Sequence, residues 1–197
     1  MRALSAEEAR TLLQAAREHR LEALFVVALG TGARQGELFG LRWGDFDANA
    51  GRLKIQRQIV DVNGKPEVSE PKTAAGRRTL DLPRFCTEAL LRHRDRQSVS
   101  PLPSAWIFSD EKGGPLRRQN FRRRVWGPLA KVAGVPGLRF HDLRHSCASL
   151  LMALNVHPRV VQSILGHADV GTTLAVYSHL AEGLGRAAAG ELDSMLG

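Results

Sequence analysis

Apolar residues recur at helical spacing through the first part of the chain. A capping box formed by Ser5 and Glu8 opens a helix that is predicted to run to Glu18. The apolar run 21–29 predicts a buried helix that must stop at the glycines following it, and 34–41 predicts a further short helix. The N-terminal part of the chain is therefore predicted to be helical.

The spacing of apolar residues then shortens from the period of a helix to that of a strand. Alternating apolar residues predict strands at 53–60, 66–70 and 78–82, and Asn63-Gly64 predicts a hairpin turn between the first two. We expect these strands to form one small antiparallel sheet.

Helical spacing returns after the strands and continues to the end of the chain. Further helices are predicted at 83–97, 117–133, 141–154, 158–165, 172–178 and 182–196. The predicted fold class is mainly α with a small antiparallel β-sheet (α+β). No internal repeat or low-complexity linker divides the chain, so we expect one domain over residues 1–197.

Composition indicates the class of partner and argues against a membrane protein or a disulfide-stabilised protein. Lysine and arginine number 28 against 20 aspartate and glutamate, a formal net charge of +8, and this favours a polyanion such as DNA or RNA as partner. No apolar stretch approaches the roughly 20 residues of a membrane span. Two cysteines, Cys86 and Cys147, provide no disulfide framework. We therefore expect a cytoplasmic protein with no membrane segment.

Arg34 follows a glycine turn at the start of a predicted helix, in the segment Thr31-Gly32-Ala33-Arg34. Helix N-termini favour anions, and the planar guanidinium fits two phosphate oxygens. The motif alone is a weak indication, because an arginine after a glycine turn is usually an ordinary surface residue.

A second cluster lies in His141-Asp142-Leu143-Arg144-His145. Residues three and four apart share a helix face, so His141, Arg144 and His145 are expected on one side. The pattern also resembles a zinc-protease motif, but aspartate is one methylene shorter than the usual glutamate and Arg144 would repel a cation. For His145 alone, a buried and hydrogen-bonded histidine is the favoured interpretation.

A third motif, Leu165-Gly166-His167, ends a predicted helix and precedes Tyr177, the only tyrosine in the chain. A single tyrosine is more often a core or surface residue than a nucleophile. Its position after the other motifs changes that balance.

Together these segments resemble the ordered signature of the tyrosine recombinase family, of the phage-integrase type. The resemblance covers nearly the whole chain and rests on five motifs in order: Thr31-Gly32-x-Arg34-x-x-Glu37-Leu38, Pro71-Lys72-Thr73, His141-x-Leu143-Arg144-His145, Leu165-Gly166-His167 and Tyr177-x-His179. It implies a catalytic set of Arg34, Lys72, His141, Arg144, His167 and Tyr177. One departure is Gly76, where many relatives carry serine.

The resemblance implies an enzyme that cuts and rejoins DNA through a 3′-phosphotyrosine at Tyr177, with neither metal nor ATP. Arg34 and Arg144 are suited to clamp the charged phosphate oxygens. Lys72 is our candidate for protonating the leaving 5′-oxygen, although a simple phosphate contact would also account for it.

The two histidines of the set have separable roles. His141 is the candidate for accepting the tyrosine proton, and His167 for donating a hydrogen bond to a phosphate oxygen; the sequence also permits the reverse. Glu37 lies one turn beyond Arg34 and could support an active-site side chain. His179 is expected to be structural.

Arginines outside this set are predicted to contact DNA phosphates or a groove. They are Arg77, Arg78, Arg117, Arg118, Arg122, Arg123 and Arg124. A solvated basic face is the alternative interpretation.

The expected partner is double-stranded DNA, with self-association on it as a tetrameric synapse by family resemblance. Family members usually carry an additional N-terminal domain that clamps DNA. The chain begins where the catalytic domain normally begins, so we expect the N-terminal domain to lie outside this chain. We therefore expect the chain to bind DNA weakly and with strong salt dependence. Type IB topoisomerases share the nucleophile and the arginine clamp and form one alternative, and a non-catalytic DNA-binding regulator forms another. A metallohydrolase built on His141 and His145 is a third.

Overall fold

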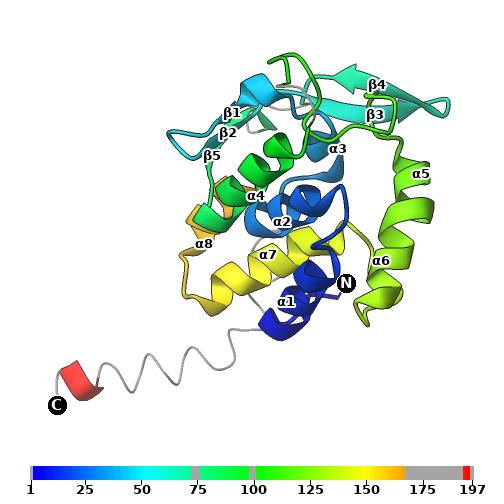
Figure 1. Cartoon of the computed structure of the whole chain (residues 1–197). Helices are drawn as coiled ribbons and strands as arrows, with labels where there is room; N and C mark the ends of the chain where they lie inside the picture. The colour runs from blue at the N-terminus through cyan, green and yellow to red at the C-terminus, as the bar shows by residue number, and fades with distance from the viewer. Residues whose placement is uncertain (1, 72–75, 98–100, 167–192, 196–197) are drawn as a thin grey trace.

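Helix α2 (Glu22–Thr31) lies at the centre of the fold and is buried along almost its whole length (Figure 1). The computed structural model describes residues 2–71, 76–97, 101–166 and 193–195. Helix α2 packs against α4 (Arg84–Asp95), α7 (Asp142–Ala153) and α1 (Ala6–Ala15). Its apolar residues on every side explain this position, because a helix with no polar face must be covered all round.

The predicted start of α1 is confirmed, but its predicted end is not. Ser5 accepts a hydrogen bond from the Glu8 amide and Glu8 accepts one from the Ser5 amide, which completes the capping box. The helix ends at Ala15 rather than at Glu18, and turns follow to Leu21. One of these turns is closed by His19, whose Nδ1 accepts from the Leu21 amide.

Two small antiparallel sheets replace the single sheet that the sequence predicted. The first has the order β1–β2–β5, from β1 (Phe46–Asp47), β2 (Arg52–Ile55) and β5 (Arg78–Asp81). Leu53 and Ile55 of β2 point into the core, as their alternation indicates.

The second sheet is the hairpin of β3 (Gln58–Val62) and β4 (Lys65–Ser69), closed at Asn63 and Gly64. The predicted hairpin turn is therefore confirmed. Gln56 and Arg57 separate β2 from β3, and the Arg57 guanidinium forms an ion pair with the buried Asp45. The two strands belong to different sheets, so the prediction of one continuous strand at 53–60 was wrong.

A long basic helical segment covers one side of the molecule (Figure 1). It comprises α5 (Arg118–Phe121), a π-helical turn η3 (Arg122–Trp126) and α6 (Gly127–Val132). Its inward face packs aromatic rings, with Phe121 and Trp126 against Phe140 at centroid distances of 5.0 and 5.2 Å. The arginines remain on the outer, exposed face.

The remaining elements complete a mainly helical fold with small antiparallel sheets, which confirms the predicted fold class. They are α3 (Gln35–Phe39), the 3₁₀ turn η1 (Trp43–Asp45) and α8 (Pro158–Leu165). The helices predicted at 172–178 and 182–196 lie outside the described residues, apart from 193–195, which are helical. Within the described part of the chain no helix combines the length and apolarity that a membrane crossing requires.

Candidate active site

Arg34 is held at the N-terminus of α3 by the turn that precedes it. Gly32 ends α2 in the left-handed conformation with φ 60°, which a glycine adopts without strain. The Arg34 side chain then donates from Nη1 to Glu37 Oε1 at 2.9 Å and from Nη2 to the Gly166 carbonyl at 2.9 Å. It remains 39% exposed, so it is fixed in place and still reachable by a ligand.

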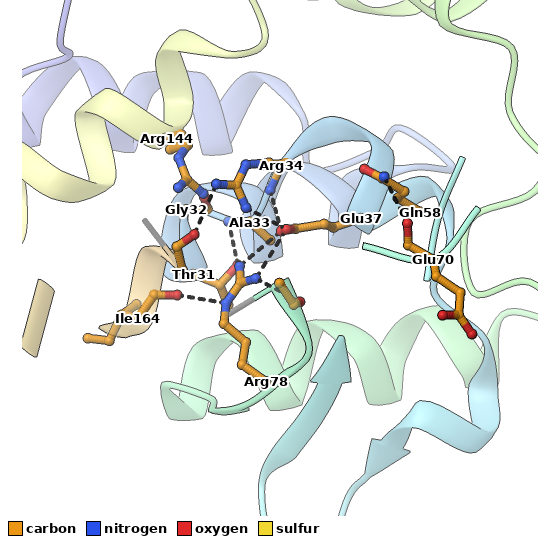
Figure 2. A network of polar contacts seen from close by, with 12 residues as sticks. Thr31, Gly32, Ala33, Arg34, Glu37, Gln58, Glu70, Arg78, Arg144 and Ile164 are labelled. Carbon is orange, nitrogen blue, oxygen red and sulfur yellow. Dashed lines mark hydrogen bonds and ion pairs between the residues drawn. The ribbon is translucent and has the colours of Figure 1, made fainter. Parts of the chain in front are cut away.

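Glu37 is the buried anion that organises this region (Figure 2). Its side chain is 2% exposed and binds two guanidiniums, those of Arg34 and Arg78. Burial raises the pKa of the Glu37 carboxyl, but hydrogen bonds and charge from Arg78 and Arg34 outweigh burial, so the pKa lies below its ordinary value. Glu37 thus holds the Arg34 side chain, as its position one turn beyond Arg34 allowed, and the catalytic role of Arg34 stays a prediction.

Arg78, in contrast, is not on the exposed surface where the sequence placed it together with Arg77. Its side chain is 9% exposed, against 57% for Arg77. It binds both oxygens of Glu37, at 3.1 and 2.9 Å, and its Nε donates to the Ile164 carbonyl at 3.1 Å. Arg78 is the first residue of β5, whereas Arg77 lies in the bend that precedes the strand.

Arg144 comes from α7 and lies beside Arg34 (Figure 2). It is 4% exposed, and its Nη1 donates to the Gly32 carbonyl at 2.7 Å. Burial, and then the positive charge of Arg34, lower the pKa of Arg144 to about 9. The guanidinium therefore remains charged at neutral pH.

His141 and His145 lie one turn apart at the start of α7, with ring centroids 5.2 Å apart. Burial, followed by the charges of His145 and Arg144, lowers the pKa of His141 below 6.5. Burial also lowers the pKa of His145. Both rings are therefore mainly neutral at pH 7, and a neutral imidazole can accept a proton.

A hollow of about 350 Å³ opens next to this cluster, between α3, the β3–β4 hairpin and the start of α5. Its lining includes Arg34 and His141 as well as Arg117 and Arg118. The structure thus connects part of the predicted catalytic set with part of the predicted DNA-contacting set. The other three arginines of that helical segment, Arg122, Arg123 and Arg124, are exposed and lie outside this lining.

Three members of the predicted set, Lys72, His167 and Tyr177, lie outside the described residues, as does His179. The chain on either side of Lys72 is described, and Pro71 and Gly76 are in close contact there. A Cβ added to Gly76 would lie 2.4 Å from the Pro71 Cβ, so any side chain at this position would require these two residues to separate. Similarly, Gly166 immediately precedes His167 and is described.

Sequence reasoning missed the backbone contribution to this site. It recognised Gly32 and Gly166 as helix ends, but not that their carbonyls bind Arg144 and Arg34. A left-handed glycine at a helix end is a visible signal for an exposed carbonyl, but its partner is distant in the chain. Among the described residues, no group of three or more histidine, cysteine, aspartate or glutamate side chains is arranged to hold a metal ion.

Comparison with known proteins gives one consistent result. The model of the phage integrase family matches residues 2–183. A tyrosine recombinase XerC-like protein of Caldanaerobacter subterraneus is 34% identical over 195 aligned residues, which cover 89% of this chain and 50% of that protein. The ICEBs1 integrase of Bacillus subtilis is 28% identical, over 87% of this chain and 48% of that protein.

Solved structures agree on the fold. The Tn1549 transposon integrase in complex with transposon right end DNA superposes with a TM-score of 0.83 at 23% identity, over 100% of this chain and 66% of that one. XerA recombinase gives a TM-score of 0.74 at 26% identity, over 91% of this chain and 58% of that one. The chain spans about half the length of the curated relatives it matches.

Proposed function

We propose that this chain, which belongs to the phage integrase family, carries the catalytic centre of a site-specific DNA recombinase that cuts and rejoins DNA through Tyr177. The observation that carries the proposal is the convergence of Arg34 and Arg144 on one site, although they are far apart in the sequence. Arg34 also contacts Gly166, eleven residues before the nucleophile.

The two guanidiniums would bind the non-bridging oxygens of the scissile phosphate. These oxygens gain negative charge in the transition state, and a fixed cation stabilises that charge more than it stabilises the ground state. Removing one such donor typically costs about 10² to 10³ in rate. Burial of Arg144 supports this role, because a charged donor stabilises developing negative charge more strongly in a water-excluded site than in water.

Departure of the leaving oxygen requires a proton. The tyrosine phenol has a reference pKa of about 10, and an alkyl hydroxyl lies near that of water, about 15.7. Expelling an unprotonated alkoxide is therefore uphill by on the order of 7 kcal/mol, at 1.36 kcal/mol per pK unit. We assign the acid to Lys72. The resulting 3′-phosphotyrosine keeps the bond energy, so a second 5′-hydroxyl can reseal the DNA without ATP.

His141 would accept the proton from Tyr177. Its lowered pKa supports the role, since the ring is neutral at pH 7 and free to take a proton. We assign His167 to a phosphate oxygen.

Double-stranded DNA is the proposed substrate, bound along the hollow that joins Arg34 to Arg117 and Arg118. The net charge of +8 supports binding to a polyanion. Strand exchange by recombinases requires protomers assembled on two DNA sites, so we propose self-association on DNA as a tetramer. Residues 1–197 would form the catalytic domain of that assembly, binding DNA weakly and with strong salt dependence when alone.

A covalent-capture experiment tests the proposal. The chain is incubated with a pool of duplexes of randomised sequence, each carrying a nick at a fixed position so that cleavage releases a short strand and cannot reverse. Wild-type protein should form an adduct stable in detergent, and mass spectrometry should locate the DNA on Tyr177. Sequencing the attached DNA then supplies the preferred site.

Tyr177→Phe is the matched control, because it removes one oxygen atom. It should yield no adduct while binding the selected duplex as wild type does. An adduct that persists in Tyr177→Phe, or no adduct in the wild type, would refute the nucleophile assignment. A non-catalytic DNA-binding protein would give the second result.

A further inference from the structure

The structure assigns Arg78 a positioning role in DNA cleavage: its guanidinium joins Glu37, which holds Arg34, to the last turn of α8, the helix that precedes His167 in the chain. This inference rests on the proposed function. Arg78 belongs to neither the predicted catalytic set nor, by its placement, the exposed DNA-contacting surface.

The contacts of Arg78 span three segments that are distant in the sequence (Figure 2). Two nitrogens bind the two oxygens of Glu37 on α3, which is the bidentate geometry specific to a guanidinium. The third nitrogen, Nε, binds the carbonyl of Ile164 on α8. Nη1 also lies 3.4 Å from the carbonyl of Gly76, the first described residue after the Lys72 segment.

The end of α8 needs these donors. The last carbonyls of a helix have no partner within it and carry a partial negative charge. Here Arg78 donates to Ile164 and Arg34 donates to Gly166, so two guanidiniums share one helix terminus and one carboxylate. The next residue in the chain is His167. Arg78 is therefore one of two side chains that anchor the end of α8, immediately before His167 in the sequence.

The balance of charge explains why Glu37 needs Arg78. Glu37 is buried, and its oxygens accept from the Arg34 backbone and side chain as well as from Arg78. Without Arg78, Arg34 would be the main partner of a buried carboxylate. Arg34 would then be drawn toward Glu37 and away from a phosphate, and the end of α8 would lose its second anchor.

Such a role differs measurably from a DNA contact. A phosphate contact contributes affinity and salt dependence. A positioning residue affects the rate of the bound complex, because a displacement of about 1 Å at the reacting groups can cost 10²-fold. Arg77 and Arg78 are adjacent and chemically identical, so they offer a matched comparison of the two roles.

The test measures single-turnover cleavage of the nicked duplex selected above, with dissociation constants determined separately in the Tyr177→Phe background. Arg78→Lys keeps the positive charge and loses the planar guanidinium that binds both oxygens of Glu37. Its cleavage rate at saturating protein should fall about 10- to 100-fold, while its dissociation constant stays within about twofold. Arg77→Gln should instead weaken binding and leave the rate at saturation nearly unchanged.

Arg84→Lys, on an exposed arginine of α4, should match wild type in both measurements. Cleavage is assayed below the melting temperature of every variant. Should Arg78→Lys fail to fold, the double variant Glu37→Gln with Arg78→Gln removes both charges of the buried ion pair, and its cleavage rate at saturation should still be reduced.

Wild-type cleavage at saturation by Arg78→Lys, or by the double variant where it is needed, would overturn the inference and leave the recombinase proposal standing. Lost affinity with an unchanged rate would also overturn it, and would make Arg78 a DNA contact. Absence of an adduct with wild-type protein is a different result, because it refutes the proposed function itself.

Discussion

Arg34 Nη2 lies 2.9 Å from the carbonyl oxygen of Gly166, although the two residues are separated by 132 positions in the chain. Arg34 opens α3 and Gly166 ends α8, so the contact joins the two helix termini that border the candidate site. The same guanidinium is also bound to Glu37, which fixes its position before any substrate arrives. Such prior ordering lowers the reorganisation required when charge develops in a transition state.

Removal of the buried carboxylate should be costly to the fold. Glu37→Gln leaves Arg78, 9% exposed, without its anionic partner, and should lower the free energy of unfolding by about 3 kcal/mol. Glu88→Gln removes a carboxylate that is 46% exposed and should change it by no more than about 0.5 kcal/mol. Urea denaturation followed by circular dichroism measures both, and equal effects would contradict the central role of Glu37.

The stability that Glu37 contributes should depend on pH in a defined direction. Its pKa in the folded protein lies below the ordinary 4.5, so the contribution is complete above pH 4.5 and is lost as pH falls through the folded value. The difference in stability between wild type and Glu37→Gln should therefore shrink below pH 4.5. Denaturation midpoints of both proteins from pH 7 to pH 3 measure this; a constant difference would show that ionisation of Glu37 is not involved.

Gly32 should tolerate no side chain, for two reasons that can be separated. Its φ of 60° strains any other residue, and an added Cβ would lie 2.3 Å from Leu165 Cδ2. Gly64 has φ 77° and open space around it, so Gly64→Ala carries only the backbone strain, about 1 kcal/mol. Gly32→Ala should cost about 1 to 3 kcal/mol more, because of the overpacking.

The clash between an added Cβ at position 32 and Leu165 should make the effects of changes at these two residues on stability non-additive. Gly32→Ala combined with Leu165→Ala should destabilise less than the sum of the single changes, by about 1 kcal/mol. Thermal and urea unfolding of the four proteins completes the cycle. Strict additivity would mean that Leu165 moves aside without cost.

The cleavage rate should fall as the pH is lowered, and this fall should depend on His141. A base works in its neutral form, and the pKa of His141 is lowered by burial and by its charged neighbours. The single-turnover rate should therefore hold at pH 7 and fall with a midpoint below 6.5. His141→Gln should be slower and lack this step, whereas a change at the exposed His157 should retain it. An unchanged step in His141→Gln would transfer the role to another group.

Arginines that line the hollow should contribute more to DNA affinity than those farther along the same helical segment. Arg118 lines it together with Arg34, and Arg124 is exposed but outside it. Arg118→Gln should weaken binding and reduce the slope of log K against log salt by about 0.9, the value for one lost phosphate contact. Fluorescence anisotropy at several salt concentrations measures this slope. A larger effect from Arg124→Gln would place the DNA along a different path.

The sequence by itself determined the elements that depend on local rules. The capping box of Ser5 and Glu8, the end of α2 at Gly32 and the hairpin at Asn63-Gly64 all follow from interactions between residues close in the chain. The order of the motifs also identified the family, which the match over residues 2–183 confirms. None of these inferences required knowledge of which distant segments meet.

Only the tertiary structure decided which polar groups are buried and which partners they bind. Arg77 and Arg78 look alike in the sequence, and the fold leaves the first exposed and places the second, at the start of β5, against Glu37. The strands β2 and β3 join different sheets, and Arg57 between them pairs with the buried Asp45. The carbonyls of Gly32 and Gly166 acquire arginine partners more than a hundred positions away. These pairings arise because buried charges and open helix ends must find partners in space, and spacing along the chain does not encode which partners those will be.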